Sequence, residues 1–238
     1  MKTNIEEIND QIFRISTYLP RTKLTFNQFL ILADDPVLFH CGQNFLFSNI
    51  QESIKKVIKP EMIRWVSFSH VESDECGSLL QWMDQKKDLQ VFHGKIGSNI
   101  WLNDFPGLKP KTIENCSTID IGGRTLQWLD TPNVPHNWES GMVIDEKTQT
   151  LFCSDLFTQS GDAPAITFHS IIEKTIEMED LIGFSNPTKR TLDLLDMLIQ
   201  KDPKCLAAMH GSTYIGQGAE QLRDLKSYYL KKIGEYVN

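Results

Sequence analysis

Three imidazoles and three carboxylates stand directly after apolar runs of this sequence, where strands of a sheet are expected to end. They are His70, Glu72, Asp74, His136, Asp155 and His210. Active sites of α/β sheets gather at strand ends, because the loops there diverge while the sheet holds them rigidly. The six residues lie far apart along the chain, so their side chains can meet only by folding.

A donor set of this size favours two metal ions. Six nitrogen and oxygen ligands are too many for one tetrahedral ion, but they suit two ions with coordination positions left open. A carboxylate such as Asp155 can bridge two ions about 3.5–4 Å apart. Three carboxylates also offset much of the charge of two cations, which favours iron or manganese over a purely imidazole zinc site.

The remaining histidines lack this context. His40 and His93 end apolar runs but have no comparable acidic neighbour, and His169 lies in a polar stretch. We expect all three to be structural or exposed, because a polar residue at a strand end is usually a cap or a turn residue. Trp138 and Tyr214 closely follow two predicted ligands, and they either line the pocket or pack in the core.

The elements that must position these residues alternate between strands and helices. Apolar runs between turn residues predict strands at 11–17, 26–33, 36–41, 63–69, 89–93 and 204–210. Hairpins are predicted at 116–132 and 140–155. Helical periodicity predicts helices at 48–59, 76–87, 187–202 and 218–237. This order fits an α/β fold with four layers, an αββα sandwich, although element order alone does not single it out.

Length and charge narrow the class of protein. The chain has 238 residues, no internal repeat and no long linker, so residues 1–238 are expected to form a single domain. A net charge of -7 argues against nucleic-acid binding, which needs a basic surface. There is no apolar run of transmembrane length, and the acidic N-terminus is unlike a signal peptide. We therefore predict a cytoplasmic protein that binds neither nucleic acid nor membranes.

The cysteines indicate reduced thiols. Their odd number and the lack of C-x-x-C spacing argue against a zinc ribbon, a rubredoxin-like iron site and a thioredoxin-like motif. We expect most of the five to be buried, namely Cys41, Cys76, Cys116, Cys153 and Cys205.

The ligand motif resembles that of the metallo-β-lactamase superfamily. Its hydrolases carry H-x-H-x-D-H after a buried strand, whereas flavodiiron-type members replace the second histidine by glutamate. This sequence has H-V-E-S-D at 70–74, and the later single His, Asp and His of the family match His136, Asp155 and His210. TFNQFLIL and VLFHCG also resemble the opening strands of the family. The chain is thus similar, over roughly residues 10–215, to the diiron domain of flavodiiron proteins and to stand-alone oxygen-binding diiron proteins.

The resemblance implies a metallo-β-lactamase fold and a division of the ligands between two irons. One iron would be held by His70, Glu72 and His136. The other would be held by Asp74 and His210, with Asp155 bridging. Glu75 stands where the hydrolases have their last histidine, and the resemblance places it beside the metals without binding them. The implied cofactors are two iron ions, with manganese or zinc as alternatives, and no flavin, because this chain carries no flavodoxin domain.

Three classes of function remain open. The leading one is a non-haem diiron protein that binds O2, or NO, as a sensor, a scavenger or a reductase with an external electron donor. The alternative is a metal-dependent hydrolase of a phosphodiester, thioester or lactone, in which Asp74 would orient a metal-bound hydroxide. Glu72 argues against it, because an anionic ligand makes the metal less Lewis-acidic. The third is a non-catalytic binding or signalling module. A separate electron-donor or signalling protein and a homodimer are both compatible with the sequence.

Overall fold

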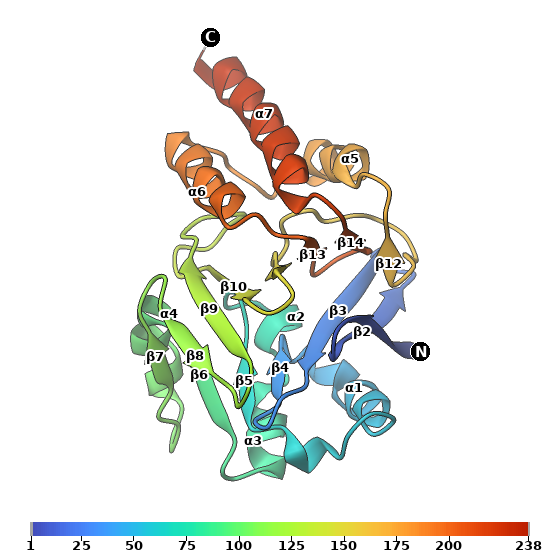
Figure 1. The fold of residues 1–238 in the computed structure, drawn as a ribbon, viewed down its shortest axis with the longest axis vertical. Coiled ribbons are helices and arrows are strands. Elements are labelled where there is room, and N and C mark those ends of the chain that lie inside the picture. The colour runs from blue at the N-terminus through green and yellow to red at the C-terminus, as the bar shows by residue number, and fades with distance from the viewer. Residues whose placement is uncertain (1, 238) are drawn as a thin grey trace.

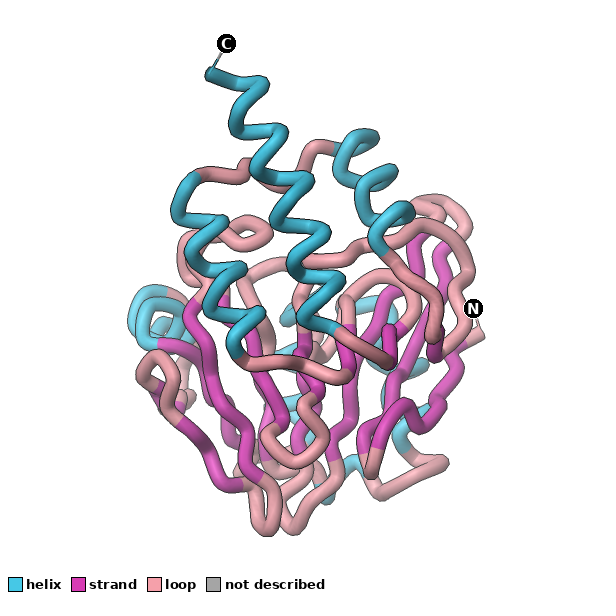
Figure 2. Tube along the Cα trace, turned by 45° about the horizontal axis from the view of Figure 1, so that its top comes forward, coloured by secondary structure: helices cyan, strands magenta, loops and turns pink. Residues whose placement is uncertain are grey.

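Two seven-stranded sheets lie face to face at the centre of the molecule, and helices cover them from outside (Figure 1). The computed structural model describes residues 2–237, the last two by their backbone alone. The first sheet comes from residues 3–113 and the second from residues 118–215. Figure 2 shows the C-terminal helices lying across the strands of the second sheet. The predicted α/β sandwich with four layers is confirmed.

The first sheet joins an antiparallel part to a parallel part. Its strands, in their order across the sheet, are β1 (Thr3–Asn9), β2 (Ile12–Leu19), β3 (Leu24–Ile31), β4 (Val37–Phe39), β5 (Trp65–Ser67), β6 (Gln90–Gly94) and β7 (Lys111–Ile113). β1 to β4 pair antiparallel, whereas β4 to β7 pair parallel. The carboxyl ends of the parallel strands therefore meet at one edge.

The second sheet is also mixed. Its order is β12-β14-β13-β11-β10-β9-β8. The strands are β8 (Thr118–Asp120), β9 (Thr125–Asp130), β10 (Gly141–Asp145), β11 (Thr150–Phe152), β12 (Ile166–Thr167), β13 (Cys205–Ala207) and β14 (Thr213–Ile215). β11 and β13 pair parallel, so the residues that follow them along the chain lie on the same side of the sheet.

Seven α-helices and three short 3-10 helices are present among the described residues. They are α1 (Phe47–Ile54), α2 (Ser73–Cys76), α3 (Leu79–Gln85), α4 (Lys95–Ile100), α5 (Ile172–Ile182), α6 (Lys189–Gln200), α7 (Gly218–Val237), η1 (Asn44–Leu46), η2 (Pro60–Met62) and η3 (Leu102–Asp104). None of the helices in this part of the chain combines the length and the apolar character needed to cross a membrane.

Apolar side chains pack in three layers, because successive residues of a strand point to opposite faces of its sheet. Between the sheets, Phe29 and Phe39 of the first sheet contact Phe152 of the second. On the outer face of the first sheet, Leu30 belongs to a cluster with side chains of α1 and α3. On the outer face of the second, Met142 belongs to a cluster with side chains of α6 and α7. Burial on both faces holds each strand, and thus each strand end, in place.

The predicted elements are present with corrections. The predicted helix at 76–87 is wrong as one element, because the chain forms α2 and α3 with a break at Gly77 and Ser78. The helix predicted at 48–59 ends already at Ile54. The strands and α-helices that the sequence did not predict are β1, β7, β12, β14, α4 and α5, and the three 3-10 helices were not predicted either. The hairpins predicted at 116–132 and 140–155 are confirmed as β8-β9 and β10-β11.

Gly141 at the start of β10 allows a close approach to a neighbouring ring. A Cβ at this position would lie 2.1 Å from Cζ2 of the buried Trp128. We expect Gly141→Ala to lower the free energy of unfolding by about 1–3 kcal/mol, the usual cost of overpacking, as measured by urea denaturation. Gly234→Ala in α7 is the control, because its Cβ would meet nothing within 4 Å and alanine favours a helix. An equal loss of stability in both variants would contradict this account.

Candidate metal centre

Four of the predicted ligands form the first half of a compact cluster. The Nε2 atoms of His70 and His136 lie 3.1 Å apart. Asp155 Oδ2 lies 3.3 Å from each of these nitrogens. Glu72 Oε1 lies 3.3 Å from His136 Nε2 and 3.9 Å from His70 Nε2. The four donor atoms all lie within 4.8 Å of one another.

The second half of the cluster is joined to the first through Asp155. Its other oxygen, Oδ1, lies 3.2 Å from His210 Nε2. Asp74 Oδ2 lies 3.3 Å from the same nitrogen. The two oxygens of Asp155 therefore face two different sets of donors, and the structure brings all six predicted side chains into one place.

Strand ends position these side chains as expected. His70 follows β5, Asp155 follows β11 and His210 follows β13, while His136 lies in the loop between β9 and β10. His70 is fully buried, and Asp155 and His210 are also buried. The side chain of Glu72 is 44% exposed, so the cluster is accessible to solvent on this side.

Hydrogen bonds at Nδ1 orient two of the imidazoles. His210 Nδ1 donates to the carbonyl oxygen of Thr25 over 3.1 Å. Because a carbonyl only accepts, Nδ1 carries the proton and Nε2 is left for the cluster. His70 Nδ1 lies 3.0 Å from Ser69 Oγ and 3.1 Å from Ser154 Oγ. These hydroxyls hold the ring with Nε2 directed at Asp155.

Sequence reasoning missed these supporting residues. Glu139 is another, because its Oε1 accepts a hydrogen bond from the backbone N–H of Val71 over 3.0 Å. This contact holds the chain between two ligands. Serine, threonine and a single glutamate in a loop are common residues, and no local pattern marks these as partners of the cluster.

Opposite charges shift the pKa values of the cluster. Burial alone would lower the pKa of each imidazole, but hydrogen bonds to the carboxylates together outweigh it. They raise the pKa of His70 to about 9 and those of His136 and His210 to about 10. Hydrogen bonds with His136 and His70 lower the pKa of Glu72 to about 2. The pKa of Asp155 lies well below its usual range although burial would raise it, because all three imidazoles face this carboxylate.

Glu75 lies beside the cluster and is wholly buried. Neither of its carboxylate oxygens has a hydrogen-bond partner among the described residues. Its Oε2 lies 3.9 Å from His70 Nε2. Burial, together with the negative charges of Asp155 and Asp74, raises the pKa of Glu75 well above its usual value.

The aromatic candidates lie outside the cluster. Trp138 is 59% exposed and lines a separate cavity of about 400 Å³ with Ile96 and Arg190, so this ring does not wall the ligands. Tyr214 belongs to the apolar cluster between the second sheet and α5 to α7. Of the two alternatives for Tyr214, core packing is the one observed.

The other histidines and the cysteines behave as expected. His40 and His93 are fully buried, and burial lowers their pKa values to about 3 and about 4. His169 is exposed. All five cysteines are free, and Cys116 alone among them is exposed.

Two cavities reach the cluster. One, of about 290 Å³, includes Glu72 and has apolar walls that contain Trp101 and Phe105. The other, of about 320 Å³, includes His136 and has a mixed lining that contains Phe184 and Arg190.

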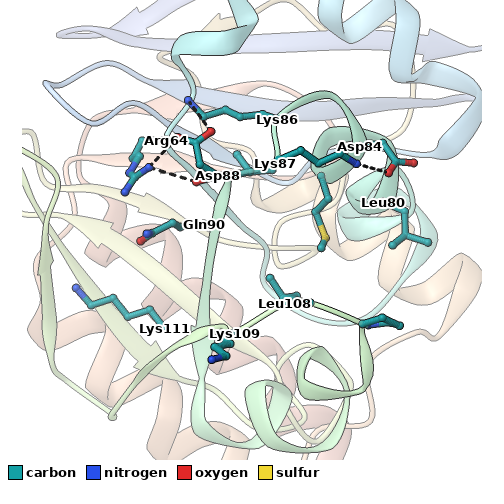
Figure 3. Close-up of a pocket in the computed structure, with 14 residues that line it drawn as sticks. Arg64, Leu80, Asp84, Lys86, Lys87, Asp88, Gln90, Leu108, Lys109 and Lys111 are labelled. Atoms are coloured by element: carbon teal, nitrogen blue, oxygen red, sulfur yellow. Dashed lines mark hydrogen bonds and ion pairs between the residues drawn. The ribbon is translucent and has the colours of Figure 1, made fainter.

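A larger cavity, of about 570 Å³, lies away from this chemistry. Figure 3 shows its basic residues, of which Arg64 precedes β5 and Lys111 begins β7. Arg64 pairs with Asp88 and Lys87 pairs with Asp84. The cavity lies at the amino ends of the parallel strands, whereas the cluster lies beyond the carboxyl end of β5, so size alone does not locate the site.

The donor set fits two metal ions on the evidence of its own geometry. Two imidazole nitrogens 3.1 Å apart point at a common position, as ligands of one ion do. Asp155 Oδ1 is buried and lacks a hydrogen bond among the described residues, as the second oxygen of a bridging carboxylate would. Mixed imidazole and carboxylate donors suit iron, manganese or zinc.

A family comparison decides what kind of protein this is. The family model described as ODP family beta lactamase matches residues 24–211. The chain belongs to this family. The matched range contains all six side chains of the cluster, and the match confirms the resemblance drawn from the ligand motif.

Individual relatives agree with the family. Flavo-diiron protein FprA2 of Clostridium acetobutylicum is 27% identical over 250 residues, which cover 93% of this chain and 61% of FprA2. The rubredoxin oxygen:oxidoreductase of Desulfovibrio gigas superposes with a TM-score of 0.80 at 17% identity, covering 95% of this chain and 61% of that one. The chain thus spans about three fifths of the length of these relatives.

One structural relative has the same extent as this chain. The chemotaxis sensor ODP, solved as a peroxy diiron species, superposes with a TM-score of 0.75 at 19% identity. The match covers 95% of this chain and 94% of the sensor chain. At these identities the structural matches establish the shared fold.

Proposed function

We propose that this member of the ODP family is a non-haem diiron protein that binds O2, with NO as a second diatomic ligand. The observation that carries the proposal is the placement of Asp155, whose two oxygens lie within 3.3 Å of imidazole nitrogens from different halves of the cluster. A carboxylate placed in this way suits a bridge between two ions. The relatives support iron, because FprA2 is named a flavo-diiron protein and the sensor a diiron species.

Each residue of the cluster then has a defined role. His70, Glu72 and His136 would hold one iron. Asp74 and His210 would hold the other, with Asp155 shared between them. Bound iron would supply the redox chemistry toward O2. The protein itself orients the imidazoles through Nδ1 and offers an apolar approach past Trp101 and Phe105, which limits water at the site.

Turnover would need electrons from a donor outside these 238 residues. These 238 residues contain no G-x-G-x-x-G stretch and no C-x-x-C pair. One relative, of Methanothermobacter thermautotrophicus and 23% identical over 143 residues, is named a coenzyme F420H(2) oxidase, which supports a role in reduction. Another relative, ODP, is named a chemotaxis sensor, which supports a role in signalling. We infer that the protein either senses O2 and acts on a signalling partner or reduces O2 with electrons from an external donor.

The test of this proposal is anaerobic. We expect the protein grown with iron to contain two iron ions per chain by elemental analysis. After reduction, addition of O2 should produce a visible absorption band, because charge transfer into ferric iron absorbs in this range. A single zinc ion per chain and no change in the spectrum on exposure to O2 would overturn the diiron assignment.

A further inference from the structure

Arg14 is a buried cation that the cluster does not use. It lies in β2, and its side chain is only 1% exposed. Within residues 2–237 it makes no ion pair with a carboxylate at 4 Å or less. Burying a guanidinium without a carboxylate partner destabilises the folded state. The hydrogen bonds of Arg14 therefore indicate its role.

Two of those hydrogen bonds lead to the turn that carries His210, and the third runs from Arg14 Nη2 to the carbonyl oxygen of Ala163 over 3.4 Å. Arg14 Nη2 donates to the carbonyl oxygen of Gly211 over 3.0 Å. Arg14 Nε donates to Asn27 Oδ1 over 2.9 Å. Asn27 Nδ2 in turn donates to the carbonyl oxygens of Gly211 and Ala208, each over 2.9 Å. Arg14 and Asn27 therefore form hydrogen bonds with the backbone on both sides of His210.

These hydrogen bonds connect β2 and β3 of the first sheet to the segment that follows β13 in the second sheet. The backbone N–H of Asn27 donates to Met209 O over 3.0 Å, and Thr25 O accepts the Nδ1–H of His210. Gly211 has a φ of +111°, and a Cβ there would lie 2.7 Å from Gln159 Cβ. The turn after His210 thus has a backbone conformation that favours glycine, and Gln159 packs closely against it.

We infer that Arg14 and Asn27 are positioning residues for His210 and set the metal affinity of the half of the centre that His210 and Asp74 form. The inference rests on the proposed diiron function. The other half is oriented by different groups, the hydroxyls of Ser69 and Ser154. A change at Arg14 should therefore affect one metal ion and spare the other.

The experiment titrates metal-free protein anaerobically with Co²⁺ and with Fe²⁺ and follows the absorption spectrum. The wild type should take up two equivalents. Arg14→Met should bind the first equivalent as the wild type does and the second about 10–100-fold more weakly, the usual effect of removing a partner of a metal ligand. Arg14→Lys keeps the charge but lacks the planar fork, so it should weaken the second equivalent too and serves if Arg14→Met does not fold.

Arg124→Met is the matched control. Arg124 is also a buried arginine, at 5% exposure, but its partners are Asp10 and Asp145. This variant should lose stability and keep both metal equivalents. If both Met variants lose metal in proportion to their lost stability, or if folded Arg14→Met binds both equivalents normally, the inference is wrong.

A metal-free readout separates this inference from the proposed function. In protein labelled with ¹⁵N-histidine, the Nδ1–H of His210 should exchange slowly with water, because it is buried and bonded to Thr25 O. Arg14→Met should speed this exchange, and Arg124→Met should not. If the wild type binds fewer than two ions, the diiron proposal fails while this measurement still tests the positioning role. Unchanged exchange in Arg14→Met overturns the positioning role.

Discussion

Asp155→Asn should reduce the metal content from two ions per chain to one or none. Asp155 contacts three imidazoles with two oxygens, and it is the side chain that faces both halves of the cluster. A neutral amide offers one weaker oxygen donor, and its NH2 group cannot bind a cation. The remaining donors would then have to hold two positive ions close together without an anion between them. Elemental analysis of protein grown with iron measures this loss.

Two controls show whether the loss is specific. His169→Ala should leave the metal content unchanged, because His169 is exposed and outside the cluster. Asp145→Asn replaces another buried aspartate, one that faces Arg124 at 3.6 Å, and should also keep both ions. If Asp155→Asn retains two ions, or if His169→Ala loses them, the ligand assignment is wrong.

The side chains that meet in the cluster could be predicted from the sequence because each combines a chemical type with a position. His70, Asp155 and His210 each follow a short apolar strand, and sites in α/β sheets form at the carboxyl ends of such strands. The residues that orient them could not be predicted. Arg14 and Asn27 sit inside strands β2 and β3, where a polar residue is usually taken to face solvent. Only the packing of the two sheets shows that both are buried.

The fold was predictable where apolar periodicity is strong. β1 was missed because its residues TNIEEIN are mostly polar and mostly half-buried, as suits an edge strand. α5 was missed because Leu181 and Ile182 at its end are exposed, which blurs the apolar stripe, although Gly183 ends the helix with a left-handed φ of +63°. The break between α2 and α3 follows from tertiary contacts, since the backbone N–H of Ser78 donates to Gly42 O over 2.8 Å and its hydroxyl donates to Cys41 O over 2.6 Å.

Glu72→His should move the centre toward zinc and weaken its response to O2. The glutamate is an anionic ligand, which stabilises ferric iron and raises the pKa of bound water, whereas a histidine leaves zinc acidic enough to ionise its water near neutral pH. The side chain is 44% exposed and borders a cavity of about 290 Å³, so an imidazole fits without repacking the core. Glu72→Gln is the matched control, because it removes the charge but keeps an oxygen donor. We expect the reduced wild type to develop a visible band with O2, Glu72→Gln to show a weaker one, and Glu72→His to show little and to retain zinc. An unchanged O2 response in Glu72→His would contradict this role of Glu72, and rapid hydrolysis of a phosphodiester or lactone by the wild type would assign this protein to hydrolytic chemistry instead.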